Sequence, residues 1–118
     1  MILLVDDDVQ LLEAAGRELD GQDSVLFAGD GAHAQSLLQA VEFSVALVDL
    51  NLPDCNGFSL IEDMHAAHPE LPIVAISGVW SGSVLESAKE FGASEVLSKP
   101  PTPEWSATVE RLRTDRMP

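Results

Sequence analysis

The sequence predicts an α/β fold in which a doubly wound, parallel sheet of five strands is covered by five helices. Short apolar runs alternate with amphipathic segments along all 118 residues, the pattern of parallel strands joined by helical crossovers. Several apolar runs lack polar alternation, as expected for strands buried on both faces. The length suits one domain, so we expect residues 1–118 to form a single unit.

The N-terminal elements follow in order. A strand is expected at 2–6, and the helix after it has apolar positions at helical spacing, namely Val9, Leu12, Gly16 and Leu19. A second strand is expected at 24–28, and Asp30 is placed to cap a second helix. A third strand, at 44–49, is apolar enough to be buried on both sides.

The middle of the chain contains the clearest loop. Residues 50–57 include two Asn, a Pro, an Asp and a Gly, all of which favour turns. A helix is expected from about Phe58 to Ala67, because Pro69 disfavours its continuation. A fourth strand follows at 71–77.

The last elements show helical periodicity again. A fourth helix has its apolar face on Val84, Leu85, Ala88 and Phe91. Gly92 suits the end of that helix, since glycine readily adopts the left-handed conformation found there. After a fifth strand at 94–98, Pro103 suits the first turn of a last helix with Trp105, Val109 and Leu112 on one face.

Composition narrows the possible roles. Six Lys and Arg face 20 Asp and Glu, giving a net charge of −14, which repels nucleic-acid phosphates. No segment approaches the roughly 18 uninterrupted apolar residues of a membrane helix. The single cysteine, Cys55, cannot form an internal disulfide, which favours a reducing, cytoplasmic location. We therefore expect no direct contact with nucleic acid or membrane.

Charged and polar residues stand where the predicted strands end: Asp6, Asp7 and Asp8, then Asp49, Ser77 and Lys99. Parallel strands bring such residues to one edge of the sheet, where these folds bind ligands. Clustered carboxylates raise one another's pKa, and one lysine cannot neutralise three of them. A hard divalent cation can, so a Mg²⁺ site is expected at Asp6, Asp7 and Asp49. Asp8 is better interpreted as a helix cap.

Four segments in this order and spacing, ILLVDDD, VALVDLNLPDCNG, LPIVAISG and GASEVLSKP, resemble the receiver domain of two-component response regulators. The resemblance covers essentially the whole chain. It implies a flavodoxin-like fold with five β/α units and strand order 2-1-3-4-5. It also implies a signalling domain and not an enzyme.

The resemblance assigns a role to each acidic residue. Asp49 matches the aspartate that accepts a phosphoryl group from a phosphohistidine, on a histidine kinase or a phosphotransfer protein. Asp6 and Asp7 match the acidic pair that holds Mg²⁺ together with Asp49. Asn51 occupies the position whose main-chain carbonyl is a further metal ligand.

The resemblance also assigns the residues that would respond to phosphorylation. Ser77 matches the switch hydroxyl, Gly78 a main-chain N–H donor to the phosphate, and Lys99 the lysine that contacts it. Pro100 would follow Lys99 in a cis peptide bond. The output partner, a separate protein or a further domain, would contact the face formed by the fourth helix, the fifth strand and the fifth helix.

Two positions depart from the family pattern. Val96 stands where many receivers have an aromatic residue that swings together with the switch hydroxyl, and a β-branched valine cannot make that movement. Trp80, in the loop after the fourth strand, is a candidate substitute. Val79 stands where the family tunes attack of water on the acyl phosphate. Valine cannot hydrogen-bond a water, so slow loss of the phosphate is expected.

Three alternatives remain at this point. Asp6 and Asp8 also suit a Mg²⁺-dependent phosphatase of the haloacid dehalogenase type, although Gln10 departs from that motif and Asp49 stays unexplained. A receiver-like interaction module without phosphorylation is the second. A flavin-binding domain is the third, but its first loop must cradle a phosphate, which three aspartates would repel.

Overall fold

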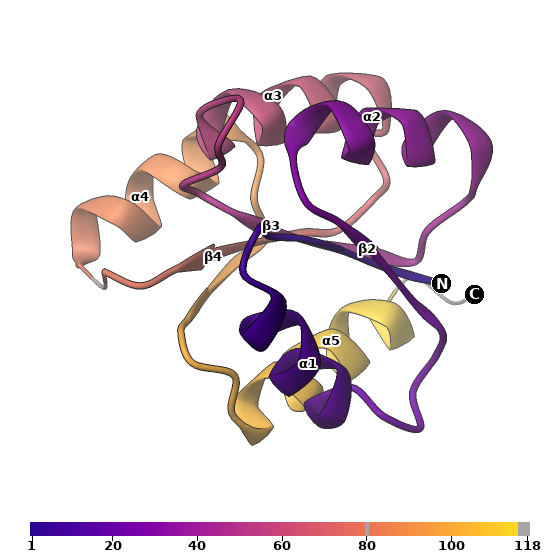
Figure 1. Cartoon of the computed structure of the whole chain (residues 1–118). Helices are drawn as coiled ribbons and strands as arrows, with labels where there is room; N and C mark the ends of the chain where they lie inside the picture. Colours follow the sequence, from indigo (N-terminus) through magenta and orange to yellow (C-terminus); the bar gives the residue numbers. More distant parts are fainter. Residues whose placement is uncertain (80, 116–118) are drawn as a thin grey trace.

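The computed structural model describes residues 1–79 and 81–115. Its five strands form one parallel sheet, and each strand is followed by a helix (Figure 1). The strands are β1 (Ile2–Val5), β2 (Val25–Ala28), β3 (Val45–Asp49), β4 (Ile73–Ser77) and β5 (Glu95–Ser98). The helices are α1 (Val9–Glu18), α2 (Gly31–Ala40), α3 (Gly57–Ala67), α4 (Gly82–Phe91) and α5 (Pro103–Asp115). The strand order is β2-β1-β3-β4-β5, so the predicted fold class is confirmed.

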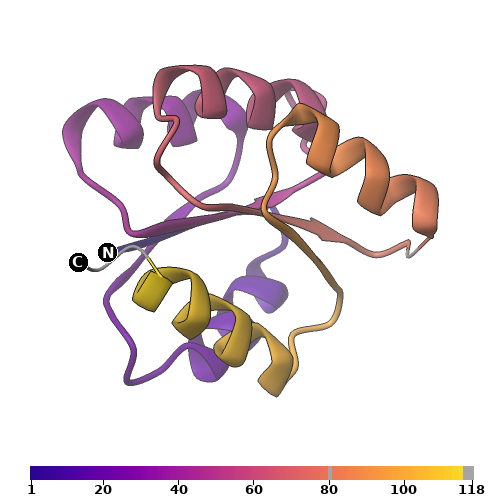
Figure 2. The ribbon, with the colours of Figure 1, turned by 180° about the vertical axis from the view of Figure 1, so that it is seen from behind.

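The sheet separates two helical layers. Helices α2, α3 and α4 cover one face, and α1 and α5 cover the other (Figures 1 and 2). Along β1, Leu3 and Val5 pack toward the three-helix layer, while Ile2 and Leu4 pack toward α1 and α5. Every residue of β1, β3 and β4 is buried, which explains why these segments show no polar alternation.

Side-chain caps fix where the helices begin. Asp8 accepts hydrogen bonds from the N–H groups of Gln10 and Leu11 at the start of α1, so its interpretation as a cap is confirmed. Asp30 caps α2 as predicted. Gly92 ends α4 in the left-handed conformation, with φ of 118°, where other residues are strained.

The buried face of α1 includes only part of the apolar set named from the sequence. Leu11, Ala15 and Leu19 face the core, whereas Val9 is 66% exposed. Val9 precedes Leu11 by two residues, about 200° around a helix, and therefore points away from the sheet. Of the positions named from the sequence, Leu19 is buried and Leu12 packs against the core while partly exposed, so the spacing identified the helix but included Val9 outside its buried face.

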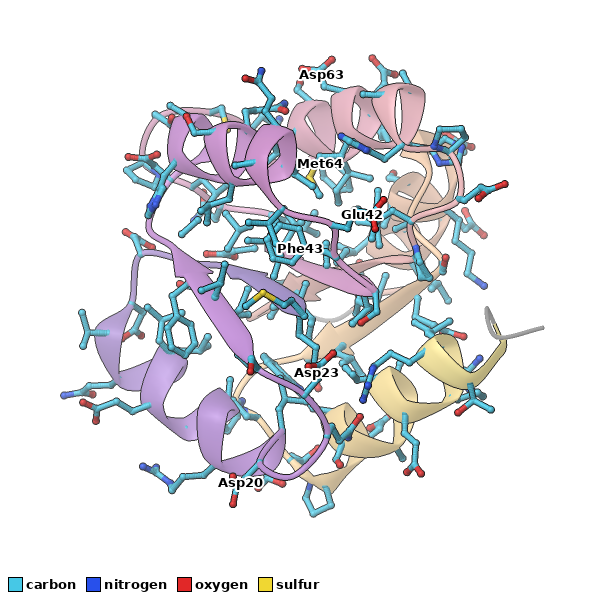
Figure 3. All side chains as sticks on the ribbon, turned by 90° about the vertical axis from the view of Figure 1, so that its right-hand side faces the viewer. Asp20, Asp23, Glu42, Phe43, Asp63 and Met64 are labelled. Atoms are coloured by element: carbon cyan, nitrogen blue, oxygen red, sulfur yellow. The ribbon has the colours of Figure 1, made fainter. Side chains whose placement is uncertain are left out.

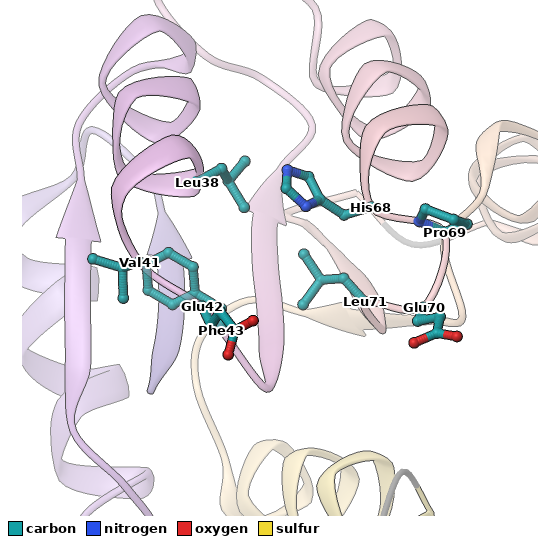
Figure 4. A pocket seen from close by; sticks show the side chains of 8 residues that line it. All are labelled: Leu38, Val41, Glu42, Phe43, His68, Pro69, Glu70 and Leu71. Carbon is teal, nitrogen blue, oxygen red and sulfur yellow. The ribbon is translucent and has the colours of Figure 1, made fainter.

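The strands begin at the end of the sheet that carries the N-terminus (Figure 1). In Figure 3, Phe43 and Met64 lie between the sheet and the layer of α2 and α3, whereas Asp20 and Asp63 point outward. A cavity of about 450 Å³ opens there, between the last turns of α2 and α3 (Figure 4). Its lining includes Leu38, Phe43, Leu71, Glu42 and Glu70. This cavity is at the opposite end of the strands from Asp49.

Among the residues that the structure describes, no helix combines the length and the apolar character that crossing a membrane requires.

Candidate functional site

The acidic residues come together because β1 and β3 are neighbours. The two strands pair in parallel with Val5 opposite Val48, so Asp6 and Asp49 end adjacent strands at the same edge of the sheet. Asp7 follows directly. One carboxylate oxygen from each of Asp6, Asp7 and Asp49 lies within 4.8 Å of the others. The strand order reverses between β1 and β3, which is where ligands bind in open α/β sheets.

Lys99 enters this cluster from the end of β5. Its Nζ lies 2.9 Å from Asp6 Oδ2 and 3.2 Å from Asp49 Oδ2. Burial alone would lower the pKa of Lys99, but its close contacts with the Asp6 and Asp49 carboxylates and their charges outweigh it and raise the pKa. Lys99 is therefore a firmly held cation, set against three carboxylates.

One lysine does not compensate the cluster. The pKa of Asp49 is raised, first by burial and then by the charge of Asp6. A hydrogen bond from the Asn51 N–H and the presence of Lys99 act in the opposite direction but do not cancel these effects. The ionised form of Asp49 is thus held in surroundings that favour additional positive charge.

Asp6 provides a test of whether a cation fits. Its Oδ1 accepts a hydrogen bond from the Asp8 N–H at 3.0 Å. Its Oδ2 is buried and receives no well-directed hydrogen bond within residues 1–79 and 81–115; the ion pair with Lys99 is its charged contact there. Buried carboxylate oxygens need such compensation. Carboxylates together with a carbonyl and water are the ligands of Mg²⁺, so the residues present fit this ion.

Above the acids is an open cavity of about 630 Å³. Residues from four strand ends line it: Asp6, Asp7, Asp8, Asp49, Leu50, Asn51, Ser77, Gly78, Val79 and Lys99. The structure thus gathers every residue that the sequence predicted for the site around one space. The cavity is wide enough for a phosphoryl group and its hydration.

The loop after Asp49 turns its main chain back to the carboxylate. The N–H of Leu50 donates to the Ile76 carbonyl at 3.1 Å, so it is not the donor that faces the cavity. The N–H of Asn51 donates to Asp49 Oδ1 at 3.2 Å. At the far end of the loop, a Cβ on Gly57 would lie 2.3 Å from the Asp49 carbonyl oxygen, and so only glycine fits there.

Ser77 ends β4 with its hydroxyl bound to its own loop. Its Oγ donates to the Val79 carbonyl at 2.7 Å and accepts from the Val79 N–H at 3.1 Å. Ser77 is 8% exposed, and its strand neighbour across the sheet is Ser98, next to Lys99. The hydroxyl is therefore at the cavity wall, held by bonds that a new acceptor in the cavity could replace.

Comparison with known proteins identifies the family. The family model described as "Response regulator receiver domain" matches residues 2–109. The chain belongs to the response regulator receiver family. It is therefore a signalling module and not an enzyme, and receiver domains of this kind work with histidine kinases and output domains.

Curated relatives extend well beyond this receiver domain. The chain is 32% identical over 100 residues to the photosynthetic apparatus regulatory protein RegA of Cereibacter sphaeroides, with 84% of the chain and 54% of RegA covered. It is 31% identical over 119 residues to the alginate biosynthesis transcriptional regulatory protein AlgB of Pseudomonas putida, with 98% and 27% covered. The chain thus spans about half or less of these relatives.

Solved receiver domains have the same fold. The receiver domain of NtrX from Brucella abortus superimposes with a TM-score of 0.89 at 27% identity, covering 97% of this chain and 98% of that one. A CheY-like receiver domain from Methanospirillum hungatei gives a TM-score of 0.89 at 25% identity, covering 98% and 94%. The match spans both helical layers and the edge that carries the acids.

The departures from the family pattern have structural counterparts. Val96 is buried in the core beneath α4. Val79 is 72% exposed beside the cavity. The peptide bond between Lys99 and Pro100 is cis, as the resemblance implies. Trp80, the proposed substitute for the aromatic residue, lies outside the described residues.

One residue of this region was missed by sequence reasoning. Asp54, in the loop after Asp49, bonds the start of α2 through the N–H groups of Gly31 and Ala32. In the sequence it is one more polar residue in a turn-rich segment. Nothing in its immediate neighbours indicates a partner more than 20 positions earlier, so only the three-dimensional structure identifies this contact.

Proposed function

We propose that this receiver domain accepts a phosphoryl group on Asp49 in a Mg²⁺-dependent reaction and signals by a change of conformation. The observation that carries the proposal is the position of Asp49, at the floor of an open cavity with two further carboxylates and Lys99. Phosphorylation of Asp49 would explain why a buried strand ends in a charged residue at that point.

The chemistry of the transfer follows from the carboxylate. An Asp49 oxygen attacks the phosphorus of a phosphohistidine, the P–N bond breaks, and its electron pair remains on the imidazole nitrogen. The group in flight is metaphosphate-like, so the protein chiefly positions it and neutralises its charge. Lys99 Nζ, already 3.2 Å from Asp49 Oδ2, would contact a phosphoryl oxygen.

Asp6, Asp7, Asp49 and the main-chain carbonyl of Asn51 would hold the Mg²⁺, which supplies positive charge to the phosphoryl oxygens. Asn51 and Gly78 line the cavity, and their main-chain N–H groups would donate to the same oxygens. The protein's contribution is thus a fixed set of donors and cations around one carboxylate.

Ser77 would transmit the change. A phosphoryl group adds about two negative charges within reach of a hydroxyl. If the Ser77 Oγ turns to the phosphate, it gives up both bonds to Val79 and releases the start of the loop that leads to α4. Of the α4 side chains, Ala88 is buried, and Val84, Leu85 and Phe91 pack against the core while partly exposed. We expect a helix with this limited burial to be able to shift in population.

The partners follow from the family. We propose a histidine kinase or a histidine phosphotransfer protein as donor. The output protein or domain would contact the face of α4, β5 and α5, where the elements that we expect to shift meet. This assignment of the face is by analogy to the family.

Phosphorylation by a small-molecule donor tests the proposal. Phosphoramidate carries the same P–N bond as phosphohistidine, and with Mg²⁺ we expect a mass gain of one phosphoryl group. The gain should vanish in Asp49→Asn and when Mg²⁺ is chelated. Asp63→Asn is the matched control, because Asp63 is an exposed acid on α3 away from the cavity (Figure 3).

Two results would overturn the assignment. A mass gain that persists in Asp49→Asn places the phosphoryl group elsewhere. No gain in any variant, with the parent folded and Mg²⁺ bound, leaves the receiver-like interaction module. The receiver domain of DrrB, which resembles this chain with a TM-score of 0.83 at 26% identity, has been solved in a BeF3-activated form. Activation of this chain by BeF3 is therefore a second test of the proposal.

A further inference from the structure

The loop that follows Asp49 is bonded at its tip to the start of α2. Asp54 Oδ1 accepts from the Gly31 N–H at 2.8 Å, and Asp54 Oδ2 accepts from the Ala32 N–H at 3.1 Å. These are the first two N–H groups of α2, which have no acceptor inside the helix. Both oxygens of one carboxylate are therefore used to join two elements that are distant in sequence.

Two different residues accept hydrogen bonds from the free N–H groups at the start of α2. Asp30, the local cap, accepts only from the His33 N–H, at 2.7 Å. Asp54, in the loop 50–57 that follows Asp49 (the phosphorylation loop), accepts from the N–H groups of Gly31 and Ala32. Its negative charge also suits the positive end of the helix dipole. The hydrogen bonds from Gly31 and Ala32 hold the pKa of Asp54 below its usual value.

The contact is closely packed. A Cβ on residue 31 would meet Cys55 Sγ at 2.6 Å and Asp54 Oδ1 at 3.4 Å. Glycine at this position lets the loop approach the helix backbone directly. The spacing between loop and helix is thus set by contact as well as by hydrogen bonds.

Other bonds of this loop are local. Asn51 and Asn56 form an isolated antiparallel bridge, the Gly57 N–H donates to the Leu50 carbonyl at 3.1 Å, and Asn56 caps α3. Among the described hydrogen bonds of residues 51–56, the Asn51 N–H bonds Asp49 at the end of β3, and those of Asp54 tie the tip of the loop to α2. A buried Leu52 side chain is the loop's apolar anchor.

We propose that Asp54 is a positioning residue for the phosphorylation site: by clamping residues 50–56 to α2, it fixes the Asn51 main chain beside Asp49. The Asn51 N–H lies 3.2 Å from Asp49 Oδ1, three positions from the clamp. This inference rests on the proposed function. It adds that the position of α2, which has no residue in the cavity, affects how well the site binds Mg²⁺ and accepts a phosphoryl group.

The chain offers a matched control for this proposal. Asp54→Ala removes the clamp, whereas Asp30→Ala removes a cap from the same helix end without touching the loop. Both variants lose a carboxylate that accepts main-chain hydrogen bonds at α2. Any effect caused merely by a looser helix end should therefore occur in both.

Three measurements follow: Mg²⁺ affinity by calorimetry, hydrogen exchange of the Asn51 amide, and the rate of phosphorylation by phosphoramidate at saturating Mg²⁺. For Asp54→Ala we expect Mg²⁺ binding to weaken on the order of tenfold, as for other residues that orient metal ligands. We also expect faster exchange at Asn51 and slower phosphorylation. Asp30→Ala should leave all three unchanged, and Asp54→Asn, which keeps one acceptor oxygen, should lie between.

Equal effects in Asp54→Ala and Asp30→Ala, or no effect in either, would overturn the positioning role. If Asp54→Ala does not fold, Ala32→Pro removes one donor from the clamp in the first turn of α2, where the N–H has no acceptor inside the helix, and should weaken Mg²⁺ binding in the same direction. Affinity and amide exchange need no phosphorylation. A parent that binds Mg²⁺ but accepts no phosphoryl group therefore refutes the proposed function and still tests the clamp.

Discussion

We expect single residues at the mouth of the cavity to affect how water reaches the proposed acyl phosphate. Val79 is 72% exposed there and offers no side-chain hydrogen bond to a water. We expect Val79→Glu to lose its phosphoryl group faster than the parent, because a carboxylate can orient and activate an attacking water. The decay of the phosphorylated mass with time measures this.

Val9→Glu is the control for that comparison. Val9 is also exposed, at 66%. The substitution adds the same charge at the first residue of α1, which does not line the cavity. If Val9→Glu accelerates decay as much as Val79→Glu, or if neither does, position 79 has no special role.

Gly57 shows how a single missing side chain allows the site to form. A Cβ there would lie 2.3 Å from the Asp49 carbonyl oxygen and 2.4 Å from Leu50 Cα, and main-chain atoms cannot move aside cheaply. We expect Gly57→Ala to lower the free energy of unfolding by about 3 kcal/mol, the upper part of the usual cost of overpacking. Gly29→Ala, with open space around it, should change it by less than about 0.5 kcal/mol. Urea denaturation compares the two.

The site residues could be predicted from sequence because each stands at a strand end. Asp6, Asp49, Ser77 and Lys99 follow apolar runs, and parallel pairing brings such ends together whatever the side chains are. Asp54 could not be predicted in this way. Its partners are main-chain N–H groups, which every residue possesses, and their position depends on how α2 packs beside the loop.

The bounds of the helices and strands were predicted most closely where the sequence contains residues that strongly favour turns. The loop 50–57 and the end of α4 at Gly92 follow from residues with special backbone preferences. The buried face of α1 was predicted less well, because two apolar sets at helical spacing compete in residues 9–19 and only packing against the sheet chooses Leu11 over Val9. Periodicity identifies a helix more reliably than it identifies its buried side.

The clamp between the phosphorylation loop and α2 should give stability a specific pH dependence. The pKa of Asp54 is lowered by the N–H groups of Gly31 and Ala32, with Cys55 also contributing a hydrogen bond. A carboxyl whose folded pKa lies below its unfolded value stabilises the fold above the unfolded pKa, here 3.8. That contribution is lost as the pH falls through the lower, folded pKa.

We therefore expect the parent to be more stable than Asp54→Asn at pH 7, with the difference shrinking as the pH falls below about 4. The other carboxyl groups titrate in both proteins and largely cancel in the difference. Urea unfolding of both proteins between pH 7 and pH 3 measures it. A difference that stays constant over this range would show that the Asp54 charge contributes nothing to the clamp.

At the scale of the whole molecule, the net charge of −14 means that any cation stabilises the fold to some degree by screening repulsion. The acidic cluster predicts an additional effect that is specific to Mg²⁺. A ligand that binds only the folded state stabilises it by about 2.7 kcal/mol when present at 100 times its Kd. At equal ionic strength, Mg²⁺ should therefore raise the free energy of unfolding of the parent well above its value in NaCl.

Asp49→Asn separates the local effect from the general one. It removes a metal ligand and the carboxylate whose pKa is raised by burial and by Asp6, so without Mg²⁺ it should be at least as stable as the parent. It should also gain little from Mg²⁺ beyond what NaCl provides, whereas Asp63→Asn should respond like the parent. If Asp49→Asn gains as much from Mg²⁺ as the parent does, the ion acts on the diffuse surface charge, and the three carboxylates do not form its site.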